Sequence, residues 1–112
     1  MSDRRADAEL RALCDEWLAM HCEVERAFAP HADRVGGPPD EVFRWFQARA
    51  PHGHALLRRI AGIRTTTLAG LRAKAEVVKA QTVLGPDGQP GVDEAVAHSL
   101  AADLLALPTR GA

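Results

Sequence analysis

A long amphipathic stripe near the N-terminus constrains the fold of this chain more than any other feature of the sequence. Its residues recur at alternating steps of four and three, the spacing of one face of an α-helix. The stripe consists of Leu10, Cys14, Trp17, His21, Val24 and Phe28. The sequence therefore predicts a helix over residues 5–29, which Pro30 ends. At about 1.5 Å per residue this helix is about 40 Å long.

Four further helices are predicted from the same spacing and from the turn formers between them. They cover residues 39–49, 54–63, 67–83 and 92–107, and the ends 1–4 and 108–112 are expected to be loose. Pro51 is expected to separate the second helix from the third, and Thr66 to be the N-cap of the fourth. Residues 84–91 contain three Gly and two Pro and are expected to form a loop.

The fold class that follows is all-α. No segment shows the period-two alternation of a strand, and 112 residues suit one compact domain, residues 1–112. The predicted architecture is a small bundle of four to five helices with a long N-terminal helix. The pattern leaves open whether residues 54–83 form two helices or one bent helix, and we favour two. The helix over 67–83 is expected to pack against both the first and the last helix.

Charge is distributed unevenly along a chain whose net charge is only −1. Residues 1–42 hold five Arg against ten acids, and residues 83–112 hold one Arg against four acids. Residues 43–82 hold eight Lys and Arg against the single acid Glu76. Acidic helices packed around a basic segment lower their mutual repulsion, so pairing within the chain is the simplest interpretation.

The cysteines and the polar start of the chain bear on its location. The start carries no apolar leader, and no window approaches the roughly 18 consecutive apolar residues of a membrane span. Cys14 and Cys22 lie eight residues apart on one predicted helix, about 12 Å, beyond the roughly 7 Å that a disulfide spans. We expect a cytoplasmic protein with reduced thiols.

Three segments carry a resemblance to a known set of proteins. DAELRALCDEW (7–17), TTTLAGLRAKA (65–75) and HSLAADLLAL (98–107) resemble small uncharacterised all-helical proteins of alphaproteobacteria. In that set an Ala-Thr-Thr-Leu-Ala-Gly-Leu-x-Ala-Lys-Ala segment precedes a terminal Asp-Leu-Leu helix. This chain has Thr65 where Ala or Pro-Ala is usual. The resemblance implies a bacterial origin and the helical layout, but no activity, cofactor or functional residue.

Aromatic side chains supply the first candidate site. Phe43, Trp45 and Phe46 form the densest cluster of large residues, which either plugs the open side of an Ala-rich bundle or forms an exposed anchor for a partner. With Trp17 they are the candidate partner-binding residues. The first helix is longer than its neighbours, so an overhanging end with an apolar seam is a candidate dimer surface.

Basic residues between positions 58 and 79 supply a second candidate. Arg58, Arg59, Arg64, Arg72, Lys74 and Lys79 could contact phosphates if they shared a face. Arg72 and Lys74 are about 200° apart on a helix, which favours a solvated surface instead. Nucleic-acid binding by a regulator is therefore the alternative function.

Histidines supply the weakest candidate, a metal site. His52 and His54 form the only HxH pair, and His21 and Glu25 stand at i and i+4. Neither is a recognised ligand pattern, and the simpler interpretation is surface or cap histidines, with His21 a half-buried core histidine. No nucleophile stands beside a base, and no phosphate-binding glycine loop is present. The sequence thus favours a non-catalytic helical interaction or assembly module without cofactor, which self-associates or binds a protein partner.

Overall fold

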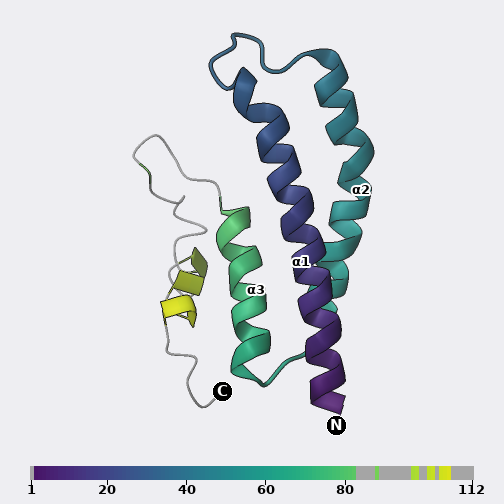
Figure 1. Cartoon of the computed structure of the whole chain (residues 1–112), viewed down its shortest axis with the longest axis vertical. Coiled ribbons are helices and arrows are strands. Elements are labelled where there is room, and N and C mark those ends of the chain that lie inside the picture. The colour runs from purple at the N-terminus through teal and green to yellow at the C-terminus, as the bar shows by residue number, and fades with distance from the viewer. Residues whose placement is uncertain (1, 83–87, 89–96, 99–100, 103, 107–112) are drawn as a thin grey trace.

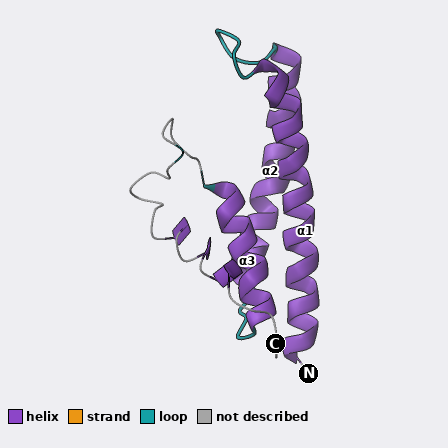
Figure 2. Cartoon of the chain, turned by 60° about the vertical axis from the view of Figure 1, so that its left-hand side comes forward, coloured by secondary structure: helices purple, strands orange, loops and turns teal. Residues whose placement is uncertain are grey.

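All regular secondary structure in the described part of the chain is helical. A computed structural model describes residues 2–82, 88, 97–98, 101–102 and 104–106. Its elements are α1 (Ser2–Phe28), the 3-10 helix η1 (Ala29–His31), α2 (Asp40–Gly62) and α3 (Leu68–Gln81). No strand occurs among these residues (Figure 2). The all-α class and the long N-terminal helix are confirmed. None of the described helices combines the length and apolar character needed to cross a membrane.

Helix α1 is the element around which the core is arranged. It lies between α2 and α3, and it packs against both (Figure 1). The core consists of Leu10, Leu13, Cys14 and Trp17 of α1, Leu56 and Ile60 of α2, and Ala73 and Val77 of α3. All the α1 members come from its first two-thirds, where α3 covers it. Beyond α3, the α1–α2 hairpin continues as two helices (Figures 1 and 2).

The break expected at Pro51 is wrong, because residues 39–49 and 54–63 belong to one helix, α2. A proline inside a helix removes a backbone hydrogen bond and costs about 3 kcal/mol. Pro51 is exposed, whereas Leu56 and Ile60 are buried. If the helix continues, the inward-facing residues before Pro51 lie on the same side of α2 as Leu56 and Ile60. That side of α2 faces α1. Phe46 before Pro51 packs on Phe28 of α1, and Leu56 and Ile60 after it lie in the core, so contacts on both sides of the proline favour one continuous helix.

The predicted helix ends also shift at the N-terminus. Residues 2–4, expected to be loose, are the start of α1. No proline or glycine stands between residues 2 and 28 to stop the helix. The chain then tightens into η1, which has Pro30 in its first turn. The predicted end of the first helix is therefore confirmed to within one residue.

The predicted last helix, residues 92–107, lies partly outside the described residues, as do most of the predicted loop 84–91 and the end 108–112. Residues 97–98, 101–102 and 104–106 are helical. Ala101 is buried, and Arg72 of α3 donates to the carbonyl oxygens of Leu104 and Leu105 at 2.7 and 2.8 Å. Helix α3 thus contacts both α1 and the C-terminal segment, as expected.

The connection between α2 and α3 is tied to α1 by one carboxylate. The hydroxyl of Thr65 donates to Asp7 Oδ1 at 3.0 Å, and that of Thr67 donates to Asp7 Oδ2. Thr67 also accepts from the backbone N–H of Gly70 at 3.0 Å, which makes it the N-cap of α3. The break between α2 and α3 is confirmed, but Thr66 is not the cap. Thr66 is exposed, because Asp7 holds the threonines on either side of it.

Gly70 is required by the close approach of this connection to α3. A Cβ at Gly70 would lie 2.0 Å from Thr65 Oγ1 and 2.9 Å from Asp7 Oδ1. These two atoms are hydrogen-bonded to each other and hold the connection in place, so neither can move without breaking that hydrogen bond. By contrast, a Cβ at Gly62 would meet nothing within 4 Å.

We expect Thr67→Ala to lower the free energy of unfolding by about 1–2 kcal/mol, because it removes the N-cap and one hydrogen bond to Asp7. Thr66→Ala is the matched control and is expected to stay within about 0.5 kcal/mol of the parent chain, since Thr66 is exposed. Urea denaturation measures both. Equal losses in the two variants would contradict the assignment of Thr67 as the cap.

We expect Gly70→Ala to destabilise the chain by about 1–3 kcal/mol, although alanine is the better helix former. Gly62→Ala, where space is open, is expected to be neutral or stabilising by up to about 1 kcal/mol. Thermal unfolding of the two variants provides the comparison. A Gly70→Ala protein as stable as Gly62→Ala would show that the close approach to Thr65 is not a constraint.

Candidate functional site

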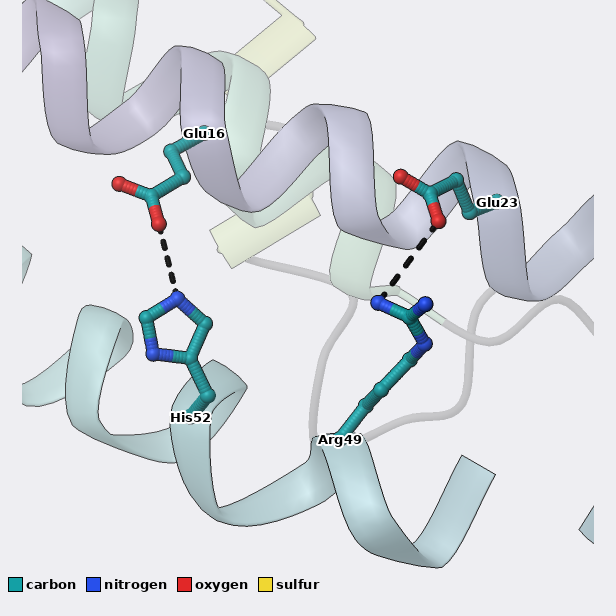
Figure 3. A network of polar contacts seen from close by, with 4 residues as sticks. All are labelled: Glu16, Glu23, Arg49 and His52. Atoms are coloured by element: carbon teal, nitrogen blue, oxygen red, sulfur yellow. Dashed lines mark hydrogen bonds and ion pairs between the residues drawn. The ribbon is translucent and has the colours of Figure 1, made fainter. Parts of the chain in front are cut away.

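The two helices of the hairpin are paired along one side by acids of α1 and bases of α2. Glu16 Oε2 lies 2.8 Å from His52 Nε2, and Glu23 Oε2 lies 3.8 Å from Arg49 Nη1 (Figure 3). Glu9 Oε1 lies 3.6 Å from Arg59 Nη2. The three glutamates are seven residues apart, so they share one face of α1. The acidic first segment does pair with the basic middle of the chain, although exposed pairs of this kind contribute only about 0–1 kcal/mol each.

The closed end of the hairpin carries an aromatic cluster. Phe28 of α1 meets Phe46 of α2 edge to face, with ring centroids 5.4 Å apart, and Phe43 lies 6.4 Å from Phe46. Phe43 remains 45% exposed, and Val35 in the loop between the helices is 99% exposed. The sequence places Phe28 in the amphipathic stripe of the first helix and not among the candidate partner-binding residues. Its position at the last step of that stripe is the signal that could have placed it here.

The four predicted partner-binding residues do not form one surface. Trp17 is only 8% exposed, belongs to the core and stacks on His21 with centroids 4.9 Å apart. The prediction that Trp17 binds a partner at the surface is therefore wrong. Phe43 and Phe46 do lie together, while Trp45 lies under the guanidinium of Arg49, 4.5 Å from its ring centroid. Trp45 and Phe46 point in different directions because residues one apart on a helix are about 100° apart around its axis.

A hollow of about 180 Å³ lies between α1 and α2. Its apolar walls are Trp17, Met20 and Val24 of α1 and Phe46, Ala50, Gly53 and Leu57 of α2. Three polar residues also line it: His21, Arg49 and His54. Small residues at positions 50 and 53 leave the space, since a Cβ at Gly53 would meet only Met20 Cε, at 3.8 Å. The sequence pattern did not reveal this hollow.

Arg49 is the polar group of the hollow with hydrogen-bonding capacity left over. Its Nε is buried and has no hydrogen-bond partner among the described residues. Its Nη1 faces Glu23 at 3.8 Å, which is an ion pair beyond hydrogen-bond distance. The Nη groups of Arg49 can therefore still donate to an acceptor that enters the hollow.

The histidines do not assemble a metal site within the described residues, where no group of three His, Cys, Asp or Glu side chains is placed to hold an ion. His21 Nε2 lies 3.4 Å from Glu25 Oε1, so this predicted pair forms. His52 contacts Glu16, whereas His54 lines the hollow. The HxH pair does not share one helix face, because α2 continues through both histidines and residues two apart on a helix point about 200° apart.

The predicted basic set is spread over two helices and the connection between them. Arg58 and Arg59 belong to α2 and Arg64 to the connection, while the other three belong to α3: Arg72, Lys74 and Lys79. Arg59 pairs with Glu9, and Arg72 donates to C-terminal carbonyls. Lys74 is half-buried. At least two of these cations, Arg59 and Arg72, thus act within the fold.

The two cysteines are free and differ in environment. Cys14 is buried in the core and Cys22 is exposed. Burial raises the pKa of the Cys14 thiol, and the neighbouring charge of Asp15 adds to the effect. A thiol with a raised pKa is a poor nucleophile at neutral pH, so Cys14 behaves as a small apolar core residue.

Comparisons of the chain with protein families, with curated proteins and with solved structures find no match. The resemblance to small alphaproteobacterial helical proteins stays a prediction. The function must therefore be argued from the hairpin itself.

We expect one thiol per chain to react rapidly with the chromogenic reagent DTNB at pH 8, and the second only on unfolding. Cys22 is accessible, whereas burial and a raised pKa keep Cys14 covered and protonated. Cys22→Ser is expected to remove the rapid phase and Cys14→Ser to leave it unchanged. Similar rates for both thiols in the folded protein would contradict the burial of Cys14.

Proposed function

We propose that this chain is a non-catalytic helical assembly module that self-associates through the closed end of the α1–α2 hairpin. The observation that carries the proposal is the apolar surface at that end, where the exposed Phe43 lies beside Phe46 and Val35 of the neighbouring loop is almost fully exposed. Aromatic side chains at the surface are the usual anchors of protein interfaces. Packing of Phe46 against Phe28 holds this surface rigid before association, which lowers the entropic cost of binding.

A second copy of the chain is the partner we propose, because the surface is complementary to itself in charge. The exposed charged residues of segment 25–44, which makes up the closed end of the hairpin, are Glu25, Arg26, Asp33, Arg34, Asp40, Glu41 and Arg44. Acids and arginines alternate in near balance, although the chain as a whole separates acidic from basic segments. In a two-fold dimer the same patch meets itself, so each acid can face an arginine of the other copy.

We further infer that each chain is a small bundle of four to five helices, with residues 92–107 as its last helix. We also infer that the protein works in the cytoplasm. The bundle is supported by the helical residues near position 101 and by the bonds from Arg72 to Leu104 and Leu105. The cytoplasmic location is supported by two free cysteines, since oxidising compartments favour paired ones.

We expect the protein at about 50 µM to elute with twice the chain mass of 12.1 kDa when measured by light scattering on the eluting peak. Phe43→Ser is expected to halve that mass, because it removes the exposed anchor. Its helical circular dichroism is expected to persist, since Phe43 is not part of the core.

Leu71→Ser is the matched control for this experiment. Leu71 is 38% exposed and lies in the first turn of α3, far from the closed end of the hairpin (Figure 1). The control is expected to keep the dimer mass. A monomeric parent chain at 50 µM would overturn the proposal, as would a dimer that survives Phe43→Ser and dissociates with Leu71→Ser.

A further inference from the structure

The hollow between α1 and α2 has the make-up of a small-molecule site, with apolar walls and a few polar groups that converge on it. We propose that it binds a small apolar carboxylate, with a ring or branched chain in the apolar part and the carboxylate on Arg49. The proposal does not depend on self-association, because the hollow is complete within one chain.

The size of the hollow sets the size of the ligand. A dry cavity of roughly 150 Å³ with apolar walls is large enough to bind benzene. The volume here, about 180 Å³, therefore suits one six-membered ring with a short chain. Trp17 is held in place by the core and by stacking on His21, and Phe46 by its contact with Phe28. Two aromatic walls are thus fixed before any ligand enters.

The charge of the lining sets the sign of the ligand. Among the described residues that line the hollow, Arg49, His21 and His54 can carry positive charge and none is acidic. Arg49 lines the hollow, and its Nη1 lies 3.8 Å from Glu23 Oε2, beyond hydrogen-bond distance, so its guanidinium keeps hydrogen-bonding capacity for a ligand. A carboxylate supplies the acceptor, and hydrogen bonds from a guanidinium to a carboxylate are stronger than those to a neutral oxygen. A neutral ligand of the same shape would leave this donor poorly satisfied.

Isothermal titration with 3-phenylpropionate, and with the neutral alcohol 3-phenylpropanol of the same shape, tests the proposal. We expect saturable binding of the acid with a Kd on the order of 0.1–1 mM, as the size of the ligand allows. The alcohol is expected to bind about tenfold more weakly. No binding of the acid at 10 mM, or equal affinity for acid and alcohol, would overturn the proposal.

Three variants separate a binding site from a general change in structure. Gly53→Leu is expected to abolish binding, because its new side chain enters the hollow while leucine favours the helix over glycine. Arg49→Met is expected to bring the affinities for acid and alcohol to within about twofold of each other. Arg58→Met removes an exposed cation of the same helix outside the hollow, and is expected to leave the tenfold preference intact.

Thermal unfolding of Gly53→Leu shows whether a loss of binding reflects a filled hollow or an unfolded protein. A folded Gly53→Leu protein that still binds the acid would place the ligand elsewhere and overturn the proposal. If Gly53→Leu unfolds, Ala50→Leu serves in its place, since Ala50 lines the same hollow. Loss of the acid preference in Arg58→Met as well would show a nonspecific effect of charge, and would also overturn it.

Discussion

The burial of one stripe of α1 from two sides is the constraint on which the rest of this structure depends. Leu10 and Cys14 are almost completely buried because α2 and α3 cover different flanks of the same helix. Each covered aliphatic side chain contributes about 1.5–3 kcal/mol, which a two-helix hairpin alone could not provide for these positions. Where α3 ends, the hairpin loses this second cover. The exposed Phe43 belongs to that part of the molecule.

Polar contacts then decide how the helices are placed on the stripe. Asp7 holds the connection that leads into α3, through the hydroxyls of Thr65 and Thr67, so α3 must begin beside the first turns of α1. The glutamates seven residues apart pair with bases of α2 and favour its antiparallel alignment. The exposed pairs add little free energy, but they penalise a shifted register, in which charges would lose their partners.

The candidate site was only partly visible in the sequence. Phe43 and Phe46 were found because large aromatics cluster in the sequence itself. Trp17 was grouped with them by residue type, yet it faces the core, since its place in the α1 stripe puts it between Cys14 and His21. The hollow could not be foreseen. It exists because small residues of α2 face α1 across a helix pair, and such facing positions depend on the register between two segments about 30 residues apart.

The sequence by itself determined the helical class, the C-terminal end of α1 and the break before α3. These rest on local physics: side chains three and four apart share a helix face, and threonine hydroxyls cap backbone N–H groups within three residues. Only the tertiary structure decided that α2 runs through Pro51 and that Thr67, not Thr66, is the cap. Both outcomes depend on contacts with α1, namely the buried face of α2 and the carboxylate of Asp7. Local propensity cannot weigh those contacts, because their partners lie 40 to 60 residues away in the chain.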